Sequence, residues 1–150
     1  MQIIKQNSSF FEILGSYLKG ILFLLFPFNF LLGDAPDWSV NSGDYSSNLS
    51  MIGSFYYNEE SFDGLNMVGA FDTNGEVRGV ATGTVYGTDY LYLITIYGNN
   101  AVEEINFKAW IAAEDTVLAV TESIQFVPDG TIGNLASPEI LNVYSNYDFV

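Results

Sequence analysis

Oxygen-bearing side chains gather in two acidic segments, residues 58–63 and 72–76. Carboxylate and amide oxygens on a tight loop are the ligands that calcium prefers. The second segment is not an EF-hand, because its glycine comes too early and the distal glutamate is missing. Both segments are candidate calcium sites, and the alternative for each is a plain turn with solvated acids. The candidate ligands are Glu59 and Asp63 in the first segment and Asp72, Asn74 and Glu76 in the second.

Arg78 is one of only two cations beyond the N-terminal region, the other being Lys108. Glu76 and Arg78 lie two positions apart on a predicted strand, so their side chains share a face. A partly buried arginine that is bonded to a carboxylate would hold two strands together. We predict a structural ion pair at Arg78, and the alternative is recognition of a carboxylate on a ligand.

Aromatic side chains are abundant, with 10 tyrosines and 2 tryptophans. Sugar-binding β-proteins stack pyranose rings on such faces and bond the hydroxyls with nearby acids and amides. Trp110 is predicted to point outward beside Lys108, which makes it the best single candidate for stacking. The alternative is that these rings cover a core or a sheet edge, where tyrosine and tryptophan also fit. The candidate ligand-binding residues are Trp110, Tyr92 and Tyr86.

Composition excludes several classes of function. The chain has no histidine and no cysteine, which removes Ser-His-Asp and Cys-His catalysis, thiolate or imidazole zinc sites, and disulfides. Its 18 acidic residues against 4 basic ones give a formal charge of -14. We therefore expect no nucleic-acid partner, because a phosphate backbone is bound by lysine and arginine.

We expect no enzymatic activity. Paired carboxylates for glycoside hydrolysis exist by residue type, but nothing in the spacing of the acids selects two of them. We rank a small acidic hydrolase as the third candidate function. A structural module is the first candidate and a carbohydrate-binding module is the second.

Residues 1–33 have the parts of a secretory signal peptide. Lys5 and Lys19 precede the apolar run 21–32, and Gly33 offers a small residue for cleavage. The apolar run is shorter than a membrane-spanning helix needs, and Pro27 interrupts it. We expect a secreted or cell-surface protein that contacts the membrane only through this leader during export. An uncleaved signal anchor and a buried core helix are the alternatives.

Residues 34–150 are predicted to form one all-β domain, because β-rich runs and turn signals recur throughout. Asn74 and Gly75 between two apolar runs predict a hairpin turn. The near-continuous apolarity of 90–97 predicts a central strand that is covered on both faces. We expect an antiparallel β-sandwich, immunoglobulin-like or of the carbohydrate-binding-module type, in preference to a barrel. The expected strands are 49–57, 67–71, 76–81, 90–97, 103–112, 116–127 and 139–144.

Three segments in their order along the chain carry a resemblance to a known kind of module. They are 68–81, 90–100, and 104–110 followed by 126–138. This order resembles a β-sandwich module repeated in secreted and cell-surface proteins of Bacteroidota. The resemblance implies a non-catalytic extracellular module that serves cell-surface architecture or adhesion. Its expected partners are an extracellular glycan or another cell-surface protein. A carbohydrate-binding module that uses exposed aromatic residues, with calcium as an assisting ion, is the alternative.

Overall fold

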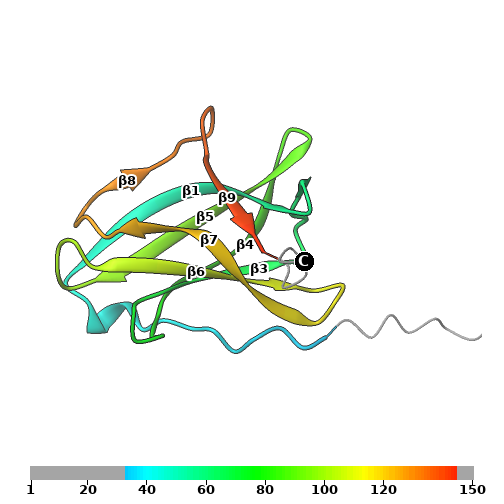
Figure 1. Ribbon diagram of the computed structural model, residues 1–150. Helices are drawn as coiled ribbons and strands as arrows, with labels where there is room; N and C mark the ends of the chain where they lie inside the picture. Colours follow the sequence, from blue (N-terminus) through cyan, green and yellow to red (C-terminus); the bar gives the residue numbers. More distant parts are fainter. Residues whose placement is uncertain (1–32, 145–150) are drawn as a thin grey trace, which may run out of the picture. The chain divides into compact units, whose positions relative to one another are not determined.

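The computed structural model describes residues 33–144, so the predicted leader lies outside the described residues except for Gly33. Nearly all regular structure in this part is β-strand (Figure 1), which confirms the all-β class. The one other regular element between residues 33 and 144 is a short 3₁₀ turn, η1 (Ser42–Asp44). No helix in the described range has the length and apolarity that crossing a membrane requires.

Each strand expected from the sequence is present, and two very short strands are added. Residues 67–71 match a strand at both ends, whereas the strand predicted for 76–81 continues to Tyr86. The strands are β1 (Ser47–Tyr57), β2 (Glu60–Ser61), β3 (Met67–Phe71), β4 (Val77–Tyr86), β5 (Asp89–Gly98), β6 (Glu104–Ile111), β7 (Thr116–Gln125), β8 (Thr131–Ile132) and β9 (Glu139–Val143).

The strands form a closed ring. They pair in the order β1-β5-β4-β3-β6-β7-β9, and β9 pairs with β1 again, which makes a barrel of 7 strands. β1 runs parallel to β8 and β9, while its other pairings and those of the remaining strands are antiparallel. The antiparallel sandwich is therefore not confirmed. An alternating strand buries one face equally well in either architecture, so closure depends on the distant pairing of β1 with β9.

The barrel interior is the hydrophobic core. On β6 the expected alternation is confirmed, because Ile105, Phe107, Ala109 and Ile111 are all buried. The expectation that β5 is covered on both faces is met only in part: on the outward face Leu91 is buried, but the side chain of Leu93 is 52% exposed. A barrel has a single interior, so an outward apolar residue such as Leu93 contacts solvent wherever no other segment covers it.

The segment that leads into the barrel, residues 33–40, lies against the outer face of β3 and β6 (Figure 1). Gly33 contacts Asp115, which follows β6. Further along, the ring of Trp38 meets that of Phe71 edge to face, with 5.2 Å between centroids. Gly69 on β3 leaves room for Trp38, since a Cβ at this position would lie 2.9 Å from the indole ring. This segment therefore covers apolar side chains that the barrel turns outward.

Candidate functional site

Arg78 lies at the centre of a buried ion-pair network. Its Nη2 is 2.9 Å from Oδ2 of Asp72 and 2.6 Å from Oε1 of Glu103. The face of the Tyr45 ring lies 4.8 Å from the guanidinium carbon. Arg78 also donates from Nη1 to the carbonyl oxygen of Tyr97 on β5, at 3.4 Å. The network thus joins β4, the β3–β4 turn, β5 and the segment before β6.

The carboxylate partners of Arg78 are Asp72 and Glu103, and not Glu76, which lies two positions away in the sequence. No ion pair between Arg78 and Glu76 is present among the described residues, and Glu76 is exposed. Asp72 precedes the turn, and the backbone N–H groups of Asn74 and Glu76 both donate to its Oδ1 at 2.9 Å. Glu103 is 25 residues from Arg78 in the sequence. Only the folding of the strands brings it within reach.

The electrostatics of this network favour the charged forms of Asp72 and Arg78. Burial by itself raises the pKa of the Asp72 carboxyl, but hydrogen bonds from Arg78, Glu76 and Asn74 bring that pKa below its usual 3.8. Burial by itself lowers the pKa of Arg78, but Asp72 and Glu103 raise that pKa above its usual value. Arg78 therefore stays protonated wherever the protein is folded.

We predict that the stability of the protein falls at acid pH through Asp72. Its pKa is lower in the folded than in the unfolded state, so its stabilisation is complete above the unfolded pKa of about 3.9. The stabilisation is lost as the pH falls through the lower, folded pKa. Denaturant unfolding at a series of pH values should show this loss, and Asp72→Asn should flatten the acid limb. An equally steep acid limb in Asp72→Asn would assign the loss to other carboxyls.

The candidate calcium ligands are not gathered into one site. Both oxygens of Asp72 already accept N–H groups, and Arg78 would repel a cation placed there. Asn74 and Glu76 are exposed on the same turn. Asp63 accepts the N–H of Leu65 at 2.9 Å, while Glu59 lines a separate cleft. Across residues 33–144, no three His, Cys, Asp or Glu side chains are grouped so that they could hold a metal ion.

Two of the three candidate stacking residues are buried, which corrects the prediction for them. Trp110 occupies an outward register position as expected, but it is only 6% exposed and its Nε1 donates to Asp115 at 3.3 Å. The alternation of side chains along a strand predicts the direction in which Trp110 points, but it does not predict which other segments cover the side chain. Tyr92 lies in the core, with its hydroxyl donating to the carbonyl of Asp63 at 2.6 Å, and burial raises its pKa. Tyr86 is 50% exposed near the tip of the β4–β5 hairpin.

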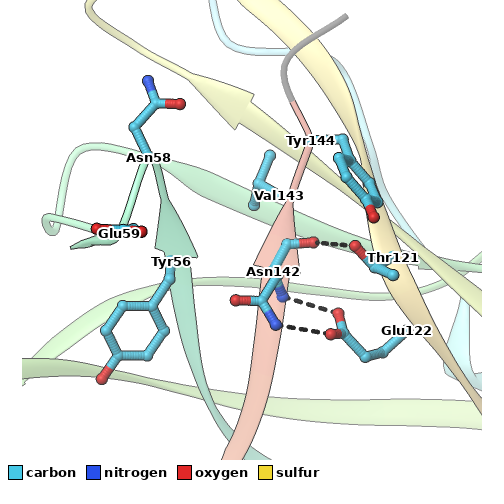
Figure 2. A pocket seen from close by; sticks show the side chains of 8 residues that line it. All are labelled: Tyr56, Asn58, Glu59, Thr121, Glu122, Asn142, Val143 and Tyr144. Atoms are coloured by element: carbon cyan, nitrogen blue, oxygen red, sulfur yellow. Dashed lines mark hydrogen bonds between the residues drawn. The ribbon is translucent and has the colours of Figure 1, made fainter. Parts of the chain in front are cut away.

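An open cleft of about 510 Å³ lies where β9 closes the ring between β1 and β7 (Figure 2). Its lining is polar and aromatic and contains two carboxylates. In Figure 2, Tyr56 and Tyr144 flank β9. The lining residues are Tyr56, Asn58, Glu59, Thr121, Glu122, Asn142, Val143 and Tyr144.

At this cleft, hydrogen bonds from side chains join β7 to β9 where the backbone pairing is short. The backbone register joins these two strands at a single pair, Val120 with Val143. Beside it, both oxygens of Glu122 accept hydrogen bonds of 2.7 Å, one from the backbone N–H and one from the side-chain amide of Asn142. Thr121 donates to the carbonyl oxygen of Asn142 at 3.1 Å (Figure 2). The two hydrogen bonds from Asn142 on β9 therefore fix the Glu122 carboxylate in place, and they also hold β9 against β7.

The other carboxylate of the cleft comes from a tight hairpin. Tyr57 pairs with Glu60, so Asn58 and Glu59 form a two-residue turn between β1 and β2. Both turn residues have positive φ angles, 52° for Asn58 and 65° for Glu59, as a type I′ turn requires. Glycine is the residue usually preferred at the second position. Glu59 is therefore held in a backbone conformation that its side chain disfavours.

The sequence predictions contained Glu59 and the segment 58–63 to which Asn58 belongs, but they missed the residues that β7 and β9 contribute to this cleft. One signal was visible: Glu122 stands in an alternation with Leu118, Val120 and Ile124, whose side chains pack against the core. A carboxylate at a position facing the interior needs hydrogen-bond donors. Its donor, Asn142, could not be identified without the strand order.

Comparison with known proteins adds no assignment: no protein-family model, curated protein or solved structure matches the chain.

Proposed function

We propose that this protein is an exported, non-enzymatic barrel module of cell-surface architecture or adhesion, and that the cleft between β1, β7 and β9 binds an extracellular glycan. The observation that carries the proposal is the lining of that cleft, which combines two tyrosines with amide, hydroxyl and carboxylate groups. Export is supported by the signal-peptide pattern of residues 1–33. The resemblance to modules of Bacteroidota surface proteins agrees with the same function.

The chemistry of the lining suits a sugar. An aromatic ring offers an apolar face with a polar handle, which matches the mixed surface of a pyranose. The amides of Asn58 and Asn142 are each able to donate and accept hydrogen bonds, as sugar hydroxyls require. The volume of about 510 Å³ falls in the range usual for small-ligand sites. Another cell-surface protein is the alternative partner, and it would dock through the same open face.

Tyr56 is expected to carry much of the binding energy. Screening the full chain on a glycan array and titrating the best oligosaccharide should show that Tyr56→Leu weakens binding at least about tenfold, or about 1.4 kcal/mol. Tyr86→Leu is the comparison variant, because Tyr86 is an exposed strand tyrosine outside the cleft. It should keep the wild-type affinity, and a loss of binding in Tyr86→Leu alone would instead place the site at Tyr86, the candidate named from the sequence. Equal affinities of wild type and Tyr56→Leu would contradict the proposed site. Release of shorter sugars from the same oligosaccharide would replace the proposal with a hydrolase.

Calcium as an assisting ion stays part of this proposal, through Glu59 in the cleft. Repeating the titration in millimolar calcium and in chelator tests it. Tighter binding in calcium would support an assisting ion, and identical affinities would remove it.

A further inference from the structure

We infer that hydrolysis of the Gly33–Asp34 peptide bond gives the exported barrel its N-terminus, and that the new α-ammonium group of Asp34 pairs with the carboxylate of Asp115. This inference rests on the export part of the proposed function and does not involve the glycan cleft. In the hydrolysis, a leader peptidase adds one water molecule across the peptide bond. Gly33 then ends in a carboxylate, and the nitrogen of Asp34 becomes a protonated amine.

The Gly33–Asp34 bond lies in the accessible part of the N-terminal segment. Gly33 is half-buried, whereas Asp34 and Ala35 are exposed. The anchored part of the segment begins after them, since Pro36 is half-buried and its carbonyl oxygen accepts the N–H of Trp38 at 2.8 Å. A small residue before the cleaved bond is also what a leader peptidase requires. The bond that the sequence pattern selects is therefore open to a peptidase.

The carboxylate of Asp115 lies where the new terminus forms. A Cβ on Gly33 would overlap the Asp115 carboxyl group, so residue 33 contacts Asp115 through its Cα and only glycine fits there. The backbone nitrogen of Asp34 is about 2.4 Å from that Cα, across the carbonyl carbon of Gly33. When Gly33 departs with the leader, the space between this nitrogen and the carboxylate becomes free for the ammonium group.

Asp115 is suited to hold a cation. Its Oδ1 accepts the Nε1–H of Trp110 at 3.3 Å, and an ionised carboxylate has about four lone-pair sites, so acceptor capacity remains. Neither salt bridge within residues 33–144 includes Asp115. The two side-chain cations of this range, Arg78 and Lys108, have other partners. The α-ammonium group of the processed chain supplies the cation that Asp115 lacks.

This ion pair fastens the second end of a segment that is already fastened at Trp38. The ring of Trp38 packs on that of Phe71, with 5.2 Å between centroids. From there back to Asp34 the segment lies against the outer face of β3 and β6 (Figure 1). The first residues of a domain fray unless they are tied down. The terminal ion pair therefore keeps residues 34–38 against the barrel.

Export of the full chain from a bacterial host tests the cleavage. N-terminal sequencing and the intact mass of the exported protein should show Asp34 as the first residue. A different first residue, or an uncut chain in the membrane fraction, would overturn the inference. The glycan site is tested independently, because the Tyr56→Leu titration compares two proteins that carry the same N-terminus.

An aminopeptidase that removes acidic residues tests the ion pair on the processed protein. Asp115→Asn should lose Asp34 about fivefold faster than the wild type, because trimming follows the population of the detached terminus and an exposed ion pair changes it by up to about that factor. Asparagine keeps an oxygen for Trp110 and tolerates the φ of 47° at this position. Glu114→Gln is the matched control: Glu114 instead accepts the hydroxyl of Tyr57, and this variant should be trimmed at the wild-type rate.

Labelling with an amine-reactive reagent at about pH 8 gives a second measurement. Relative to Lys108 as the internal reference, the α-amine should react more slowly in the wild type than in Asp115→Asn, because pairing favours the unreactive protonated form. High salt should remove this difference. Equal trimming and labelling of the wild type and Asp115→Asn would overturn the ion pair and leave the cleavage site standing. Equally fast trimming of Glu114→Gln and Asp115→Asn would also overturn it, because net charge would then explain the effect.

Discussion

Replacing Arg78 with alanine is expected to lower the free energy of unfolding by about 3–5 kcal/mol. The side chains of Arg78 and Asp72 are only 7% and 2% exposed, and that of Glu103 is 21% exposed. Removing the guanidinium leaves two carboxylates close together and poorly solvated, with no cation to offset their desolvation. Denaturant unfolding of Arg78→Ala and of the wild type measures the difference.

Lys108→Ala is the matched control for this prediction. Lys108 is the other cation of residues 33–144, and it is exposed over the ring of Phe71. Its loss should change the free energy of unfolding by no more than about 1 kcal/mol. An Arg78→Ala loss above roughly 2 kcal/mol exceeds what an exposed pair contributes and supports the structural role. Unchanged stability together with lost binding of an anionic ligand would assign Arg78 to a binding site instead.

Replacing Phe55 with alanine is expected to cost about 3–5 kcal/mol of unfolding free energy. Phe55 on β1 is fully buried and lies in the middle of an aromatic cluster. Its ring centroid is 5.2 Å from that of Tyr92, 6.2 Å from that of Phe62 and 6.4 Å from that of Phe107. The substitution removes contacts to all three rings and leaves a cavity that the closed ring of strands cannot easily fill.

Leu93→Ala is the control for Phe55→Ala, since Leu93 lies on the neighbouring strand β5 and is 52% exposed. It should change the free energy of unfolding by less than about 1 kcal/mol, because surface substitutions have small effects. Guanidinium unfolding of both variants gives the comparison. Fitting each curve separately checks that the slope of unfolding free energy against denaturant concentration is the same in both. Similar losses in the two variants would mean that the barrel interior is not the principal source of stability.

The strands and turns of this protein were largely predictable from the sequence, because both are local properties. The strand predicted for residues 67–71 is β3. The turn predicted at Asn74 and Gly75 joins β3 to β4, with Gly75 at a φ of 85°. Period-two alternation also identified the inward residues of β6. Each of these features depends on neighbours in the sequence, where pattern and turn chemistry act directly.

The architecture was not predictable in the same way. Alternating strands fit a sandwich and a barrel equally well, and the choice depends on β9 returning to lie parallel to β1. That pairing joins Gly53 to Glu139 at one end and Tyr57 to Val143 at the other. No local pattern specifies it.

The site residues were decided by tertiary structure for the same reason. Trp110 points outward as its strand predicts, yet the outer face of its sheet is covered, and Tyr92 belongs to the core. Arg78 bonds Asp72 and Glu103 rather than the nearer Glu76. The sequence alone determined which side chains alternate and where the chain turns. Which of them meet depended on strand order and ring closure, because side-chain partners come from pairings between segments that are far apart in the chain.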